Sequence, residues 1–227
     1  MNEIQPSAKT RVLVVDDHPI VREGLALLFR QKMDLEICGE AEDAEQTLAA
    51  IAARPPDIAI IDITLKNSNG LDLIRLLRDR HPSLPVLVLS VHDESIYAER
   101  ALRAGARGYI MKEELTEKVV EAIHCVLNGK IYLSPRMSEK LLTHFVGGQT
   151  PVRQSPVERL SDRELAVYQM IGQGLGTRDI AERMHISPKT VQSYRSRIKD
   201  KLQLGNSSDL LQHAVLWTHS QQEPPSS

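Results

Sequence analysis

Five short apolar runs, each followed by an amphipathic segment, fill residues 11–128 and constrain the fold more than any other feature of the chain. The runs are predicted strands at residues 11–15, 35–41, 57–62, 85–90 and 108–111, and the amphipathic segments are predicted helices at 19–30, 43–54, 71–80, 95–104 and 116–128. Continuous apolar runs of this length are typical of strands buried on both faces of a parallel sheet. The alternation therefore predicts a doubly wound α/β domain with helices on both faces.

The composition changes after this domain. Residues 129–157 form a predicted linker that contains a short helix at 135–145 and then a stretch rich in Gly, Pro and polar residues. Residues 158–219 show no strand pattern, and four helices are predicted at 161–172, 177–184, 187–202 and 206–219. Ser161 and Glu164 have the spacing of a capping box at the first of these helices. The N-terminal residues 1–10 are expected to be flexible, and the tail at 220–227 disordered.

The charge is distributed unevenly between the two parts of the chain. Residues 1–128 carry a net charge of −6 and residues 129–219 one of +5, which suggests a cation for the first part and a polyanion for the second. No stretch reaches 18 consecutive apolar residues, and the first ten residues lack an apolar signal-peptide core, so we expect a cytoplasmic protein without a membrane partner. Cys38 and Cys125 lie in apolar settings and are expected to be buried, reduced thiols.

Three carboxylates stand at predicted strand ends. Asp62 closes the third strand, where a single aspartate would more often be a helix cap, and Asp16 and Asp17 follow the first strand. If these two strands are neighbours, the carboxylates converge at the carboxyl edge of the sheet, where open α/β sheets bind ligands. Clustered anions repel one another unless a cation joins them, and hard oxygen ligands suit Mg²⁺. Helix capping before Pro19 remains an additional role for Asp16 and Asp17.

Two further polar residues end the remaining strands of this edge. Ser90 ends the fourth strand and Lys112 follows the fifth. A hydroxyl and an ammonium aimed at a carboxylate that holds Mg²⁺ suit phosphoryl transfer, because that reaction needs mainly positioning and charge neutralisation. Asp62 would then be the nucleophile and would form an acyl phosphate.

These residues resemble a two-component receiver domain over residues 10–128. The resemblance rests on Val-Asp-Asp-His-Pro at 15–19, Asp62, Ser90, Lys112 and Ala-Gly-Ala-Arg-Gly-Tyr at 104–109. It implies a flavodoxin-like (βα)5 fold for the domain at 11–128, in which Asp62 accepts a phosphoryl group from a sensor histidine kinase. Asp17, the Asp62 carboxylate and the Thr64 backbone carbonyl would hold Mg²⁺, and Asp16 would assist.

The same resemblance assigns a switch pair, Ser90 and Tyr109. The hydroxyl would bind a phosphoryl oxygen and the aromatic ring would follow it inward. Lys66 departs from the proline that many family members carry in the loop after the phosphoacceptor, which puts the rigidity of this loop in question.

The third C-terminal helix carries five cations against Asp200, and Val191, Ile198 and Leu202 fall together with Tyr194 on its apolar face. A charge run alone is usually a solvated face, but the preceding helix and the tight turn at 185–188 make a helix-turn-helix, whose second helix enters the major groove. The segment resembles a LuxR-type helix-turn-helix through Leu-Ser-Asp-Arg-Glu at 160–164, Gly174, Ile-Ala at 180–181, Ile-Ser at 186–187, Thr-Val at 190–191 and Ile-Lys-Asp-Lys-Leu at 198–202.

By this resemblance, three residues would face bases and five would mainly touch phosphates. The base-facing residues are Gln192, Ser193 and Ser196, and the phosphate-facing residues are Lys189, Thr190, Arg195, Arg197 and Lys199. Tyr194 stands where many members carry histidine.

The whole chain is similar to the NarL/FixJ class of response regulators, in which a receiver precedes a small all-α four-helix domain. The resemblance implies a sensor histidine kinase, double-stranded promoter DNA and RNA polymerase as partners, and a homodimer on activation. The net charge of +2 on residues 158–219 favours affinity that depends on dimerisation. Self-phosphoryl transfer and slow autodephosphorylation would be its only chemistry.

Two alternatives remain at this point. An aspartate-nucleophile phosphatase also places Asp at a strand end with Mg²⁺, but such enzymes usually carry a second aspartate two residues later, where this chain has Thr64. The receiver could instead serve as a dimerisation module that does not depend on phosphorylation, although the intact set of strand-end residues argues against this function.

Overall fold

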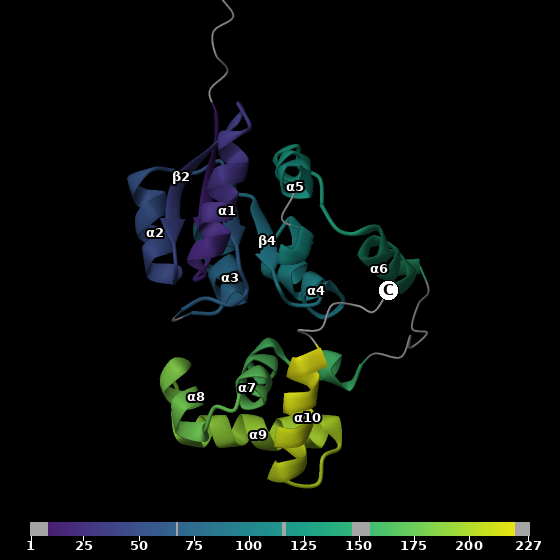
Figure 1. The fold of residues 1–227 in the computed structure, drawn as a ribbon. Helices are drawn as coiled ribbons and strands as arrows, with labels where there is room; N and C mark the ends of the chain where they lie inside the picture. The colour runs from purple at the N-terminus through teal and green to yellow at the C-terminus, as the bar shows by residue number, and fades with distance from the viewer. Residues whose placement is uncertain (1–8, 67, 115–116, 147–154, 221–227) are drawn as a thin grey trace, which may run out of the picture. The chain divides into compact units, whose positions relative to one another are not determined.

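The computed structural model describes residues 9–66, 68–114, 117–146 and 155–220, and the chain divides into two compact units, residues 1–142 and 143–227 (Figure 1). The described residues leave out 1–8 and 221–227, which belong to the chain ends expected to be flexible or disordered. They also leave out residues 147–154 of the expected linker. Among the described residues, no helix is long and apolar enough to cross a membrane.

The first unit contains a parallel five-stranded sheet in the order β2-β1-β3-β4-β5. Its strands are β1 (Thr10–Val15), β2 (Leu35–Ala41), β3 (Ile58–Ile61), β4 (Val86–Ser90) and β5 (Gly108–Met111). Its helices are α1 (Pro19–Arg30), α2 (Ala44–Ala53), α3 (Gly70–Arg80), α4 (Glu94–Ala104) and α5 (Glu117–Leu127). The predicted flavodoxin-like doubly wound fold is confirmed.

The strands are buried on both faces, as their continuous apolar sequences predict. Every residue of β3 and β4 is buried. Val12 and Ile60 belong to a core cluster that also contains Phe29 of α1 and Ile123 of α5. This packing places the carboxyl ends of β1, β3, β4 and β5 next to one another at one edge of the sheet.

A further helix, α6 (Pro135–Val146), follows α5 and packs against α4 through residues that belong to the first unit. Ser134 Oγ donates to Glu94 Oε1 over 2.5 Å, and Lys140 Nζ donates to the Ser95 carbonyl over 2.9 Å. Met137 is 1% exposed. The first half of α6 is therefore an integral part of the first unit.

The second unit contains the four predicted helices. They are α7 (Asp162–Gly172), α8 (Thr177–Arg183), α9 (Pro188–Leu202) and α10 (Ser207–Ser220), preceded by a short 3₁₀ helix at Pro156–Arg159. The capping box is confirmed, since Ser161 Oγ accepts from Glu164 N and Glu164 Oε2 accepts from Ser161 N. The all-α class of this domain is confirmed as well.

The structure corrects several local predictions. Asp43 caps α2 by accepting from Gln46 N over 2.9 Å and so lies outside the helix that was predicted to include it. Ser220 was assigned to the tail but ends α10. The two cysteines are free as expected but only half-buried, because Cys38 lies on the edge strand β2 and Cys125 lies on α5 close to its end.

Candidate functional site

Asp62 lies directly after β3 and is 1% exposed. Its Oδ1 accepts hydrogen bonds from Ser90 Oγ (2.7 Å) and Ile63 N (2.6 Å), and its Oδ2 accepts from Lys112 Nζ (2.7 Å). Ser90 ends β4 and Lys112 follows β5, so three strand ends meet at one carboxylate. The sheet topology thus brings together residues that lie 28 and 50 positions apart in the sequence.

Lys112 also joins Asp62 to the end of β1. Its Nζ lies 2.6 Å from Asp16 Oδ2, and the lysine side chain is 7% exposed. Burial disfavours the charged ammonium, but the attraction of Asp62 and the hydrogen bonds to both carboxylates outweigh burial and raise the pKa of Lys112. Lys112 therefore stays charged and neutralises part of the carboxylate cluster.

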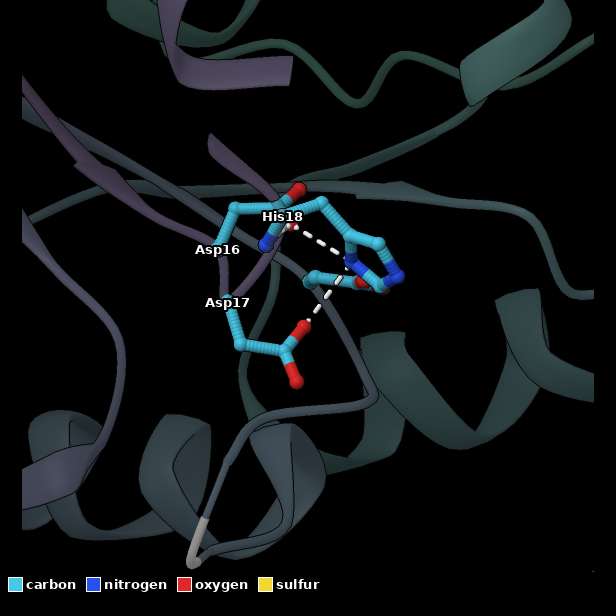
Figure 2. A group of neighbouring side chains, drawn as sticks. Asp16, Asp17 and His18 are labelled. Carbon is cyan, nitrogen blue, oxygen red and sulfur yellow. Dashed lines mark hydrogen bonds and ion pairs between the residues drawn. The ribbon is translucent and has the colours of Figure 1, made fainter. Parts of the chain in front are cut away.

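The side chains of Asp16, Asp17 and His18 lie close together after β1 (Figure 2). We call these three residues and Asp62 the acidic pocket. One potential ligand atom from each of these four residues lies within 4.8 Å of the others. His18 Nδ1 is 3.1 Å from Asp16 Oδ1 and 2.9 Å from Asp17 Oδ1.

The donor set of the acidic pocket fits a divalent cation. Asp17 Oδ1 is buried and lacks a hydrogen bond of good geometry. A buried carboxylate oxygen without a well-aligned hydrogen-bond donor is costly, and a bound cation removes that cost. Carboxylate oxygens from Asp16, Asp17 and Asp62 are ligands that Mg²⁺ accepts.

Tyr109 and His92 lie beside Ser90. Tyr109 is 1% exposed, and its hydroxyl donates to the His92 carbonyl over 2.7 Å. His92 Nε2 lies 2.8 Å from Thr64 Oγ1, so this imidazole links the loop after β4 to the loop after β3. Burial lowers the pKa of His92 and raises the pKa of Tyr109 well above 10, which keeps both side chains neutral near pH 7. His92 was not singled out from the sequence, where its only signal is its place two residues after Ser90.

The loop after β3 has Lys66 where many family members carry proline, and contacts between Lys66 and Glu42 hold it. Lys66 Nζ lies 3.1 Å from Glu42 Oε2, and Lys66 N donates to the Glu42 carbonyl over 3.1 Å. The hydrogen bond from Lys66 is the main cause of the lowered pKa of Glu42. A Cβ on Gly70 would lie 2.1 Å from the Asp62 carbonyl oxygen, so only glycine allows the loop to return this close to the strand end.

The second unit presents α9 after the turn at His185, whose φ of 53° lies in the left-handed region. Ser187 caps α9 by accepting from Thr190 N over 3.1 Å. Val191, Ile198 and Leu202 are buried as their spacing predicts. The predicted DNA-contacting residues are exposed at Lys189, Gln192, Ser193, Ser196 and Arg197 and half-buried at Thr190, Arg195 and Lys199.

Lys201, also on α9, has a structural partner. Its Nζ donates to Glu164 Oε2 over 2.6 Å, and Glu164 is 3% exposed. Burial opposes ionisation of Glu164, but the hydrogen bonds from Lys201 and Ser161 outweigh it and lower the pKa of Glu164. Lys201 thus ties α9 to the start of α7. The sequence shows the charge on Lys201 but not this partner 37 residues away.

Both units match known protein families. Residues 12–124 match the response regulator receiver domain, and residues 158–214 match the bacterial regulatory proteins of the luxR family. Similar curated proteins include the response regulator GacA of Pseudomonas viridiflava, which is 35% identical over 90% of this chain and 95% of its own length. The oxygen regulatory protein NreC of Staphylococcus carnosus is 30% identical over 90% of this chain and 96% of its own length.

Solved structures show the same fold. RcsB of Salmonella enterica serovar Typhimurium, bound to promoter rprA with a phosphomimetic beryllium fluoride, aligns with a TM-score of 0.68 at 24% identity, covering 91% of this chain and 98% of RcsB. A LuxR-family two-component response regulator from an Aurantimonas species aligns with a TM-score of 0.56 at 32% identity, covering 61% of this chain and 99% of its own.

The two family matches account for both units in the order in which they occur along the chain. The family consists of transcription regulators rather than enzymes. The chain belongs to the two-component transcriptional response regulators, which join a receiver domain to a LuxR-type DNA-binding domain.

Proposed function

We propose that Asp62 is the phosphoacceptor of this regulator and that a sensor histidine kinase is its phosphoryl donor. The observation that carries the proposal is the arrangement around Asp62, whose two carboxylate oxygens are held by Ser90 and Lys112 in a buried pocket beside two further carboxylates. In the transfer, an Asp62 oxygen attacks phosphorus, the nitrogen–phosphorus bond of the phosphohistidine breaks, and an acyl phosphate forms.

The residues of the pocket divide this work. Lys112 balances negative charge on Asp62 and on the incoming phosphoryl oxygens, and Ser90 turns its hydroxyl from Asp62 Oδ1 to a phosphoryl oxygen. Asp16, Asp17, Asp62 and the Thr64 backbone carbonyl would hold Mg²⁺, which supplies further positive charge to the transferring group. Tyr109 completes the switch pair from its buried position next to Ser90.

The output of the proposed switch is binding of promoter DNA by α9. This helix presents Lys189, Arg197 and the exposed Gln192, Ser193 and Ser196 broadly on the side opposite its buried residues. We infer that phosphorylated chains form a homodimer that pairs two such helices on a two-part site. Because promoter DNA and RNA polymerase lie in the cytoplasm, we place the regulator there.

Labelling of the full-length protein with a small acyl phosphate and Mg²⁺ tests the phosphoacceptor. We expect a phosphoryl adduct that peptide mass spectrometry locates on Asp62 and that Asp62→Ala abolishes. Asp79→Ala is the matched control, since Asp79 is an exposed aspartate on α3 and its removal leaves the adduct in place. An adduct that persists in Asp62→Ala would refute the assignment.

A further inference from the structure

His18 adds a nitrogen donor to the acidic pocket, and its place there is set by the local backbone. It stands at the N-cap of α1 before Pro19, and its side chain makes no capping hydrogen bond. Instead, His18 N donates to Asp16 Oδ1 over 2.9 Å, which turns the imidazole toward the carboxylates (Figure 2). The side chain is 55% exposed, so it lies on the solvent side of the acidic pocket.

The spacing of the donor atoms matches a metal coordination sphere. Two adjacent ligands of an octahedral ion with bonds of about 2.1 Å lie about 3 Å apart. The distances from His18 Nδ1 to Asp17 Oδ1 (2.9 Å) and to Asp16 Oδ1 (3.1 Å) have this value. One cation placed between the three atoms would replace the two contacts of the imidazole nitrogen and would bind the buried Asp17 oxygen as well.

We propose that His18 Nδ1 is a ligand of the cation in the acidic pocket and that it shifts the preference of the site from Mg²⁺ toward first-row transition dications. Imidazole nitrogen binds ions such as Co²⁺ and Ni²⁺ well, whereas Mg²⁺ prefers oxygen. This inference rests on the proposed function, in which the pocket holds a divalent cation. It adds a fourth side chain to the three carboxylates and the carbonyl proposed for Mg²⁺.

Titration calorimetry on the full-length protein compares the affinities for Co²⁺ and Mg²⁺. We expect His18→Asn to lower the ratio of Co²⁺ affinity to Mg²⁺ affinity by about tenfold. His124→Asn is the matched control, because His124 Nε2 pairs with Asp34 Oδ2 at 2.7 Å on the surface of the same unit, away from the pocket. The control should leave the ratio unchanged. An equal ratio in His18→Asn and the wild type would overturn the proposal.

Pulsed electron paramagnetic resonance with Mn²⁺ supplies a direct readout. A bound imidazole gives a nitrogen coupling to the metal, which should be present in the wild type and absent in His18→Asn. A wild type without this coupling, but with Mg²⁺-dependent phosphorylation of Asp62, would refute the role of His18 and leave the proposed function intact. A wild type that binds neither Mg²⁺ nor Co²⁺ in the pocket would refute both.

Discussion

Lys112 is the residue on which the charge balance of the acidic pocket depends most. It contacts both Asp16 and Asp62, and its side chain is 7% exposed, so solvent screens these contacts little. Its removal leaves two buried carboxylates without this cation and, in the proposed function, takes away a donor to the transferring phosphoryl group.

We expect Lys112→Gln to slow the phosphorylation of Asp62 by a small acyl phosphate about 100-fold, since loss of one such donor has an effect of this order. The rate is measured by quantifying the phosphorylated protein over time. Lys118→Gln serves as control, because Lys118 is exposed and pairs with Glu114 outside the pocket. A Lys112→Gln rate within twofold of the wild type would contradict the role given to Lys112.

Helix α9 is held in place by the ion pair between Lys201 and Glu164, and this contact has a defined pH dependence. The folded-state pKa of Glu164 lies below its ordinary value of 4.5. A carboxyl group with a depressed pKa contributes stability above its unfolded-state pKa and loses the contribution as the pH falls through the folded-state pKa. The stabilisation by Glu164 is therefore complete near pH 7 and is lost below about pH 4.5.

We expect Glu164→Gln to reduce the free energy of unfolding of the DNA-binding domain at pH 7 by about 1.5–3 kcal/mol, the scale of a hydrogen bond to a charged group. The difference from the wild type should shrink below pH 4.5. Urea unfolding at pH 7 and below about pH 4.5 measures the free energy of unfolding and its change with pH. The probe is the fluorescence of Trp217, whose ring centroid lies 5.3 Å from that of Tyr168. Glu182→Gln on α8 is an exposed control. A pH-independent difference would show that the carboxylate charge is unimportant.

The predicted phosphate-contacting and base-contacting residues of α9 should affect DNA binding differently. Lys199→Ala removes a predicted phosphate contact and should weaken binding to all sequences alike, with a salt slope that falls by about 1. Gln192→Ala removes a predicted base contact and should cost about 1–3 kcal/mol on the preferred site only, because other sequences never made that contact. Affinities on a selected site and on unrelated DNA at several salt concentrations separate the two effects. Identical behaviour of the two variants would contradict these assignments.

For the whole molecule, phosphorylation should control assembly on DNA. The DNA-binding domain at residues 158–219 carries a net charge of only +2, so a single copy makes a weak electrostatic contact. We expect phosphorylation to raise the affinity for a site with two half-sites at least tenfold, with little change on one half-site. Gel-shift titration and sedimentation of the same samples would measure this gain. Equal affinity of the wild type and Asp62→Ala with acyl phosphate would favour a receiver that dimerises without phosphorylation.

Local patterns in the sequence are enough to predict the two domain classes. The burial of a strand on both faces appears directly as a continuous apolar run, as in Ile58–Ile61, and a helix with one buried face appears as the spacing of Val191 and Ile198. Because the carboxyl ends of parallel strands share one edge, the strand-end positions of Asp62, Ser90 and Lys112 also predict that they meet. Helix ends were less predictable, since Asp43 caps α2 rather than joining it.

Only the tertiary structure decided which side chains form pairs. His92 with Thr64, Lys66 with Glu42 and Lys201 with Glu164 are joined over 28, 24 and 37 residues. Such contacts depend on strand order, loop path and rotamer, and periodicity reports only the face on which a residue lies. His18 shows the same limit between neighbouring residues. Its position before Pro19 suggests a helix start, and it is the N-cap of α1, but only the structure shows that its imidazole lies against Asp16 and Asp17. By itself, the sequence determined the fold class and pointed to the residues of the proposed phosphoacceptor site, and the packing of the chain decided how their charges are balanced.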